Sequence, residues 1–377
     1  MNHFVATPLL AAALAAAGAA QAQDVQTVRI AHVGPLTGAS AHLGKDSENG
    51  VRMAIDELNA QKLHIGGRPV RFQLDAEDDA GHPTQATVIA QRLCDSRTAG
   101  VVGHLLSGTI LPASDIYHRC GLPHITPAAT NPDVTAKGYK TTYRLFATDR
   151  ALGAALALYA ADGLGIQRVA VIDDRTAYGQ GVAEVFKATA AIKGIQIVAT
   201  EFTKNTATDF MPILTNIRAQ KPDAIFYGGM DAQAGPMLRQ MEQLGMGELR
   251  FITGDGACTG MLPALAGHVA AVGKVVCATG GVPVEKRPQG QAWKQRYDAK
   301  YPGAFQTYSP YAYDATMVLV DAMKRADSVD RKVYVNALPK TDFAGLTAHM
   351  QFTANGELTE PAVTLNTYRN NVRTPLN

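Results

Sequence analysis

The chain has 377 residues, of which 46% are hydrophobic and 18% are charged. This balance is typical of a globular protein and excludes disorder, collagen-like repeats and a coiled coil. Its 35 Lys and Arg residues nearly balance its 33 Asp and Glu residues, for a formal charge of +2, and no basic run with interleaved aromatics occurs. We therefore expect no nucleic-acid partner. Because chains beyond roughly 250–300 residues usually divide their core, we expect two lobes.

The first 22 residues resemble an export signal in composition. An apolar, alanine-rich run from Pro8 to Ala20 leads into the sequence Ala20-Gln21-Ala22, a small-x-small pattern that signal peptidase cleaves. The segment ahead of this run has no Lys or Arg, which departs from the usual pattern. We predict cleavage between Ala22 and Gln23 and a periplasmic mature protein. A short buried helix is the alternative for this segment.

Short β-branched runs alternate with helical patterns from the end of this leader to Phe146. Such alternation predicts parallel strands joined by right-handed helical crossovers. Helices are recognised by apolar residues three and four apart, as at Val51, Ala54 and Leu58. The expected strands are Val28–Val33, Val70–Asp75, Gly100–His104 and one that begins at His124, and the expected helices are Asp46–Asn59, Pro83–Leu93 and Pro112–Tyr117.

A second series of the same kind follows Phe146, and the last part of the chain returns to the first. Its expected strands are Arg168–Ile172, Gln196–Thr200, Ala224–Tyr227, Arg250–Thr253 and Lys274–Cys277, and its expected helices are Ala151–Ala161, Gly179–Ile192, Phe210–Ala219 and Ala232–Gln243. After a return crossing at Gly280–Pro283, the helices Gln289–Tyr301 and Tyr311–Ala326 complete the first lobe, and Thr341–Phe352 is expected to cross again as a strand.

The two series predict an α/β protein with two Rossmann-like lobes, each a parallel sheet flanked by helices. We assign residues 23–146 with about 282–341 to lobe 1, and residues 147–281 with about 342–377 to lobe 2. No low-complexity linker occurs, so we expect several short crossings between the lobes. Open parallel sheets bind ligands at the carboxyl ends of their strands, so we expect the site in the cleft between the lobes.

Four cysteines are present: Cys94, Cys120, Cys258 and Cys277. In an exported protein an even number of cysteines favours disulfides over metal ligands. Of the three possible pairings we favour Cys94 with Cys120 and Cys258 with Cys277, because each pair then closes a local loop within one lobe. Each bridge would stabilise the fold by about 3 kcal/mol. Free buried thiols are the alternative.

Small hydroxyl residues follow two neighbouring strands. Ser107 lies between a strand and a helix, and Thr130 lies in the loop after the next strand. Backbone N–H groups at a helix start, together with such hydroxyls, form a site for a carboxylate. Helix capping by either residue is the structural alternative. Two such loops at adjacent strand ends favour the carboxylate site.

Other sequence patterns do not predict a metal site, a nucleotide site or a catalytic site. The acidic cluster from Asp75 to His82 lacks the spacing of a calcium-binding loop, so helix capping at a solvated strand end explains it better. Two G-x-G pairs lack the third glycine of a dinucleotide site and the lysine of a P-loop. His104, His118 and His124 fall within a short span, but His118 is expected on a helix away from the strand ends, and no nucleophile–base pair is evident. We expect no metal, no cofactor and no catalysis.

The motifs taken together resemble the periplasmic leucine/isoleucine/valine (branched-chain amino acid) binding protein family of ABC transporters. The similarity runs in order over nearly the whole mature chain, and it rests on the segments Gly103–Leu105, Pro112–Tyr117, Ile125–Thr130 and Tyr227–Gly229. It implies the type I periplasmic-binding-protein fold, with two lobes joined by a three-strand hinge that close on a small amino acid. Gly81 and Leu106 stand where the family has a first-lobe disulfide, so that bridge is not expected.

The resemblance assigns the carboxylate end of the ligand to lobe 1. Ser107, Ala128 and Thr130 match the family positions that bind the ligand's α-carboxylate through hydroxyls and backbone. Leu105 and Leu106 match the adjoining wall of the pocket.

The resemblance assigns the ammonium end largely to lobe 2. Tyr178 matches an aromatic residue that covers the ligand, and Phe305 matches a side-chain contact. Asp255 stands where the family uses Glu for the α-ammonium, and a buried ammonium needs such an acceptor. Leu43 and Met230 stand where the family has Tyr. These departures bear on the identity of the ligand more than on its class.

The expected function is therefore capture of a branched-chain or related small amino acid for the membrane permease of an ABC importer, by a monomer that is not an enzyme. One alternative keeps the fold but binds an amide, a short ω-amino acid or another small acid, for transport or sensing. A second alternative is an exported enzyme on the same scaffold. Recovery of intact ligand after long incubation would exclude the enzyme.

Overall fold

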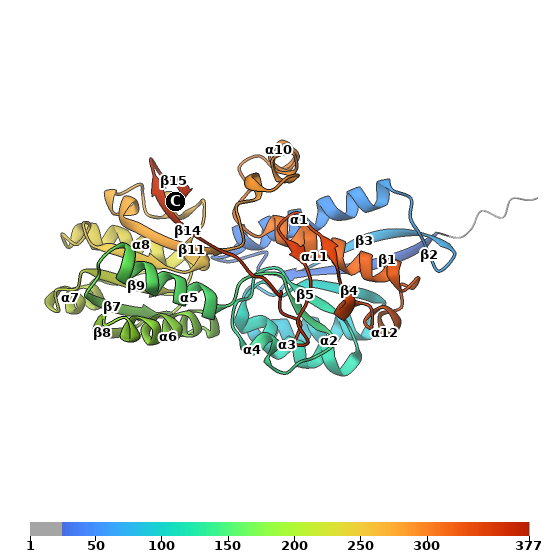
Figure 1. Ribbon diagram of the computed structural model, residues 1–377, viewed down its shortest axis with the longest axis horizontal. Helices are drawn as coiled ribbons and strands as arrows, with labels where there is room; N and C mark the ends of the chain where they lie inside the picture. Colours follow the sequence, from blue (N-terminus) through green and yellow to red (C-terminus); the bar gives the residue numbers. More distant parts are fainter. Residues whose placement is uncertain (1–24, 377) are drawn as a thin grey trace, which may run out of the picture.

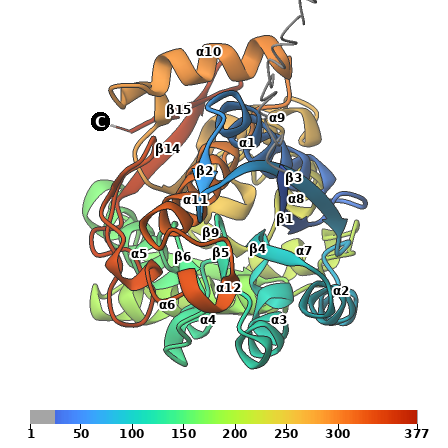
Figure 2. The ribbon, with the colours of Figure 1, turned by 90° about the vertical axis from the view of Figure 1, so that its right-hand side faces the viewer.

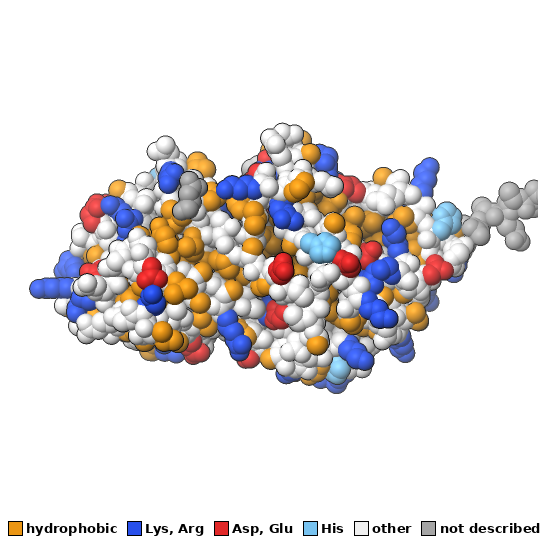
Figure 3. All heavy atoms as spheres, in the orientation of Figure 1, with side chains coloured by type: hydrophobic (Ala, Val, Ile, Leu, Met, Phe, Trp, Pro, Cys, Tyr) orange, Lys and Arg blue, Asp and Glu red, His pale blue; other side chains and the backbone are white. Residues whose placement is uncertain are grey.

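The protein is described by a computed structural model over residues 25–376, so the predicted leader lies outside the described residues. Two lobes lie side by side along the long axis of the molecule, and side chains of both charge signs are interspersed on the face in view (Figures 1 and 3). Within residues 25–376, no helix is long and apolar enough to cross a membrane.

Lobe 1 is built on a six-stranded sheet with the strand order β2-β3-β1-β4-β5-β6. All neighbours are parallel except β2 and β3. The strands are β1 (Gln26–Gly34), β2 (His64–Ile65), β3 (Arg68–Asp78), β4 (Thr98–Gly103), β5 (His124–Thr126) and β6 (Thr142–Arg144). The helices are α1 (Ala41–Ala60), α2 (Pro83–Asp95), α3 (Ser107–Cys120), α4 (Asp133–Ala136), α10 (Gly290–Lys300), α11 (Ser309–Arg325) and α12 (Arg331–Tyr334).

The alternation of side chains along β1 explains how this sheet is covered on both faces. Successive residues of a strand point to opposite faces. Val28 and Ile30 pack in the core formed with α1 and α11, whereas Ala31 and Val33 pack in the core formed with α2 and α3. Figure 2 shows α1 and α11 on one side of the strands and α2 and α3 on the other.

Lobe 2 repeats this plan on a seven-stranded sheet with the order β15-β14-β11-β10-β9-β7-β8. Its strands are β7 (Arg168–Asp173), β8 (Gln196–Phe202), β9 (Ala224–Gly228), β10 (Arg250–Thr253), β11 (Val275–Gly280), β14 (Val363–Arg369) and β15 (Val372–Pro375). One face carries α5 (Asp149–Leu158) and α6 (Ala177–Ile192), and the other carries α7 (Met211–Ala219), α8 (Asp231–Gln243) and α9 (Leu262–Leu265). Strands β14 and β15 are antiparallel, so the sheet is mixed at this edge although its centre is parallel as predicted.

The prediction of a crossing strand at Thr341–Phe352 is wrong. This segment forms a short hairpin of β12 (Phe343–Ala344) and β13 (His349–Met350), and Met350 and Leu358 are buried in the core of lobe 1. The apolar residues Met350 and Leu358 are thus buried without the chain leaving lobe 1. The chain enters lobe 2 after Leu358, and not at about residue 342 as expected.

Three short crossings connect the lobes, at residues 145–148, 281–283 and 359–362. The second and third lie side by side, because Gly281 N donates to Ala362 O at 2.7 Å. The first lies against the second, since a Cβ on Gly280 would lie 2.9 Å from the ring of Phe146. The three crossings form the three-strand hinge expected from the sequence, and Figure 1 shows the last crossing running from lobe 1 into β14.

Each lobe contains one disulfide bond. Cys94 is bonded to Cys120 in lobe 1, and Cys258 is bonded to Cys277 in lobe 2. This is the local pairing favoured from the sequence. Each bridge closes a loop within one lobe and leaves the hinge free.

Asp46, on α1, fixes the segment that leads into α11. Its Oδ2 accepts hydrogen bonds from the N–H groups of Thr307, Tyr308 and Ser309, at 2.9, 2.7 and 3.1 Å. Its Oδ1 accepts from the hydroxyl of Tyr297 at 2.8 Å. The carboxylate is fully buried, so water cannot replace it as the hydrogen-bond acceptor of these donors.

Replacing Asp46 by Ala is expected to lower the free energy of unfolding by about 3 kcal/mol or more, because several buried donors lose their acceptor. Urea denaturation measures this change. The matched control is Asp56→Ala on the same helix, where an exposed carboxylate contacts Lys300, with an expected change of about 0.5 kcal/mol at most. Equal losses in the two variants would contradict the role given to Asp46.

Candidate ligand-binding site

A cavity lies between the lobes, at the carboxyl ends of both sheets. Its volume is about 20 Å3, and a hydrogen bond from Asn131 Nδ2 to Ala177 O at 2.8 Å joins the lobes beside it. Its walls come from both lobes: Leu105, Leu106, Ser107, Ala128, Ala129, Thr130 and Tyr308 on one side, and Tyr178, Met230, Asp255 and Gly256 on the other.

The wall from lobe 1 consists of the two loops picked out by their hydroxyl residues. Ser107 begins α3 and is buried, and its Oγ accepts from Asn131 N at 3.2 Å. Thr130 is also buried, and a hydrogen bond between its hydroxyl and Asp149 acts to lower the pKa of that carboxyl. Thr126 shapes the second loop, since its Oγ1 accepts from Ala129 N at 3.0 Å. Ser107 and Thr130 thus place two buried hydroxyls on the wall of the cavity, where they suit a polar ligand group.

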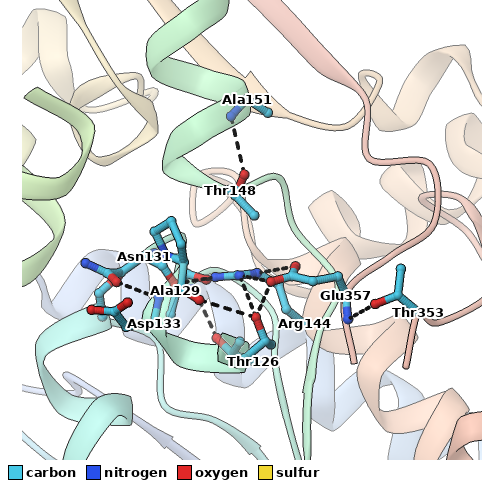
Figure 4. A network of polar contacts seen from close by, with 12 residues as sticks. Thr126, Ala129, Asn131, Asp133, Arg144, Thr148, Ala151, Thr353 and Glu357 are labelled. Atoms are coloured by element: carbon cyan, nitrogen blue, oxygen red, sulfur yellow. Dashed lines mark hydrogen bonds and ion pairs between the residues drawn. The ribbon is translucent and has the colours of Figure 1, made fainter. Parts of the chain in front are cut away.

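A buried arginine, which the sequence analysis missed, holds the second loop in place. Arg144 Nη1 donates to the carbonyl oxygens of Ala129 and Asn131, at 3.0 and 2.8 Å. Its Nε donates to Glu357 Oε2 at 2.8 Å, and its side chain is fully buried. Figure 4 shows the guanidinium group between the loop and Glu357. Arg144 and Glu357 are 213 residues apart in the chain, so no local sequence pattern predicts their contact.

The wall from lobe 2 presents a buried carboxylate. Asp255 Oδ2 accepts from the hydroxyl of Tyr308 at 2.8 Å, whereas its buried Oδ1 has no partner among the described residues. Burial raises the pKa of Asp255 to about 6, although hydrogen bonds from Tyr308 and Tyr178 act against this shift. Tyr178 lies beside it, with its hydroxyl accepting from Gly256 N at 2.9 Å. An ammonium group would supply the charge that this carboxylate lacks.

A second buried carboxylate, Asp149, lies at the first hinge crossing. Burial raises its pKa to about 7, and the charge on Asp255 acts in the same direction. Its backbone N–H donates to Thr130 O at 2.9 Å, which ties the loop of lobe 1 to the start of α5. The neighbourhood of the cavity therefore carries an excess of negative charge, which favours a cationic ligand group.

The structure brings most of the predicted residues to this cavity, but not all of them. Leu43 is fully buried behind the wall, in the same apolar cluster as Leu105. Phe305 lies elsewhere: its ring packs against Tyr297 and under the ammonium group of Lys294, 4.3 Å from the ring centre. Tyr308 lines the cavity and was not predicted, although it follows Phe305 by only three positions. The short loop before α11 turns one ring toward α10 and the other toward the cleft.

A larger space adjoins the cavity. Its volume is about 650 Å3, and it shares with the cavity Leu106, Ser107, Tyr178 and Met230. Gly81 and Leu106, at the positions of the family's first-lobe disulfide, face each other on its wall: a Cβ on Gly81 would lie 3.2 Å from Leu106 Cδ1. We infer that a ligand reaches the inner cavity through this space.

Two β/α lobes, three crossings and a polar cavity at the facing strand ends define a two-lobed binding protein for a small solute. The particular family is given by sequence comparison. The sequence profile of the Periplasmic binding protein family matches residues 27–368, and the chain belongs to this family. The resemblance seen in the sequence is thereby confirmed.

Individual relatives agree with this assignment. An "Amino acid binding protein" of Pseudomonas aeruginosa is 34% identical over 85% of each chain. A "Leucine-, isoleucine-, valine-, threonine-, and alanine-binding protein" of the same species is 29% identical, over 93% of this chain and 92% of its own. Among solved structures, a leucine binding protein of Thermotoga maritima superimposes with a TM-score of 0.85 at 28% identity, over 93% of this chain and 98% of its own.

The family consists of periplasmic substrate-binding proteins of transporters and not of enzymes. The class of protein expected from the sequence is thus confirmed, and its location follows from the family.

Replacing Glu357 by Gln is expected to lower the free energy of unfolding by about 2 kcal/mol, because the buried charge of Arg144 loses its counter-ion. The affinity for ligand should fall as well, since the loop with Thr130 loses its support. Urea denaturation and titration calorimetry measure the two effects. Glu360→Gln is the control, an exposed carboxylate of the same segment. An unchanged stability of the Glu357 variant would contradict this role.

Proposed function

We propose that the protein captures a small α-amino acid, leucine-like or smaller, between its lobes and delivers it to the permease of an ABC importer. One observation carries the proposal: a buried carboxylate from lobe 2, Asp255, and two buried hydroxyls from lobe 1, Ser107 and Thr130, share one small cavity. This arrangement complements a zwitterion. The relatives' names support an amino acid with a small or branched apolar side chain.

Each wall then has its own part in recognition. Ser107 and Thr130, with the backbone at Ala128, bind the α-carboxylate, because hydroxyls and N–H groups at a helix start accommodate an anion. Asp255 binds the α-ammonium, and Tyr178 covers the bound ligand. The side chain of the ligand contacts the apolar residues Leu105, Leu106 and Met230.

Because the two ends of the ligand bind to different lobes, only the closed state offers all contacts at once. A ligand shifts a conformational equilibrium by its difference in affinity for the two states. Closure about the three crossings is therefore the signal that the permease would read. A short amide or ω-amino acid remains the second candidate, since the inner cavity is small and Met230 is flexible enough to adapt to several shapes.

We also propose that the bound solute is not turned over and that the leader is removed between Ala22 and Gln23. The mass of the exported protein tests the second point, and recovery of the ligand intact tests the first. A mature chain that begins elsewhere, or a modified ligand, would contradict the respective proposal.

Asp255→Asn tests the proposed function most sharply, because two readouts should move in opposite directions. Binding of L-leucine by calorimetry should weaken at least 100-fold. Ligand-free protein at pH 7.5 should gain about 2 kcal/mol of stability, because a buried carboxyl whose pKa is raised opposes folding when ionised.

The matched control is Asp314→Asn in lobe 1. This carboxyl is equally buried, and burial likewise raises its pKa to about 6, but it contacts Leu346 and Thr347 away from the cavity. Its leucine affinity should stay within threefold of the wild type. If Asp255→Asn bound leucine as tightly as the wild type, the ammonium site would be elsewhere.

The affinity should also depend on pH in a defined direction. The ammonium group needs ionised Asp255, whose pKa in the ligand-free protein is raised to about 6. Affinity should therefore be constant well above pH 6 and fall about tenfold per unit below it. Burial raises the pKa of Asp149 to about 7, so this carboxyl could also make the affinity depend on pH. Calorimetry with the Asp149→Asn variant separates its effect from that of Asp255. Disappearance of the fall below pH 6 in that variant would assign it to Asp149 instead.

A further inference from the structure

We propose that His42 and Asp231, here called the closure pair, hold the lobes together and set the affinity for ligand without touching it. They would be positioning residues of the binding site. The inference rests on the proposed function only in that the ligand is held between the lobes, and it does not depend on which amino acid is bound.

The closure pair joins side chains from different lobes. His42 lies in the first turn of α1 in lobe 1, and Asp231 is the first residue of α8 in lobe 2. His42 Nε2 lies 2.7 Å from Asp231 Oδ2, and the residues are 189 positions apart. Neither residue lines the inner cavity. Opening of the lobes about the hinge must therefore separate the pair.

The surroundings of Asp231 make this contact strong. Its side chain is fully buried, and Thr259 Oγ1 also donates to Oδ2, at 2.6 Å. Its Oδ1 is buried without a hydrogen-bond partner among the described residues. A buried carboxylate with so few donors gains much from a donor that arrives on closure. The His42 side chain is 24% exposed, so water screens part of the gain.

Other contacts between the lobes differ from the closure pair. Asn131 Nδ2 donates to Ala177 O at 2.8 Å, which is a neutral hydrogen bond. The contact between Tyr308 and Asp255 lies within the cavity, so its loss would also change ligand contacts. Arg373 of β15 also contacts lobe 1, where its guanidinium group donates to Thr307 Oγ1 at 2.7 Å and to Gln306 O at 3.0 Å. Among these contacts, only the closure pair joins a buried carboxylate outside the cavity to a side chain of the other lobe.

The expected effect follows from linkage. When only the closed state binds tightly, the apparent dissociation constant varies inversely with the closed fraction of ligand-free protein. Loss of a partly exposed, charge-assisted contact should then weaken binding about fivefold to tenfold. The change should appear mainly in the rate of dissociation, because the pair forms after the ligand has entered.

The decisive variant is His42→Ala, because His42 is partly exposed and its removal leaves the lobe cores intact. Calorimetry and stopped-flow kinetics with L-leucine should show a fivefold to tenfold weaker affinity and a faster dissociation. His64→Ala, at an exposed position of lobe 1, should bind as the wild type does. In a double-mutant cycle, His42→Ala combined with Asp231→Asn should be no weaker than the weaker single variant.

A second readout needs no ligand. Labels on cysteines placed at the exposed positions Val88 in lobe 1 and Ile192 in lobe 2 report the distance between the lobes. His42→Ala should lower the closed fraction of ligand-free protein, and an unchanged fraction would overturn the proposal, as would additive effects in the cycle. If the wild type bound no amino acid, the proposed function would fail, whereas the distance measurement would still decide the role of the closure pair.

Discussion

A carboxylate enclosed between two lobes is the constraint on which the site depends. Asp255 is almost fully buried, and its side-chain hydrogen-bond donors in the described structure are the neutral hydroxyls of Tyr308 and Tyr178. Burial of a charge without full compensation is costly, and the raised pKa expresses that cost. The closed form is thus incomplete by itself, and an ammonium group is the natural complement.

The support for this carboxylate extends through lobe 1. Asp46 fixes the backbone on both sides of Tyr308, and Tyr308 in turn reaches across to Asp255. In the same lobe, Arg144 fixes the loop that carries Thr130. Both anchors are buried polar groups with several partners, which specify one geometry more sharply than apolar packing does. The wall of the cavity that lobe 1 supplies is therefore held by buried hydrogen bonds on both of its loops.

Much of this could be predicted from the sequence, because the relevant signals are local. The short β-branched run Val28–Val33 indicated the first strand, and the hydroxyls after two strands indicated the wall with Ser107 and Thr130. Asp255 and Tyr178 came from family resemblance, since nothing in their immediate sequence distinguishes them. The antiparallel edge of lobe 2 escaped prediction because β14 and β15 are only half-buried and lack a clear alternation.

The failures share a physical cause: they concern contacts between distant segments. Arg144 meets Glu357, and Asp46 meets Tyr308, only through the tertiary fold. Phe305 and Tyr308 are three positions apart, and a loop decides which ring faces the ligand. Thr341–Phe352 has the apolar content of a strand, but the core of lobe 1 already accommodates it as a hairpin.

The central claim is that one cavity recognises both charged ends of an amino acid. Calorimetric titration of the wild-type protein with L-leucine, 4-methylpentanoate and 3-methylbutylamine compares the whole ligand with analogues that lack the ammonium or the carboxylate. The account predicts that leucine binds and that each analogue binds at least 100-fold more weakly. Equal binding of leucine and either analogue would contradict it.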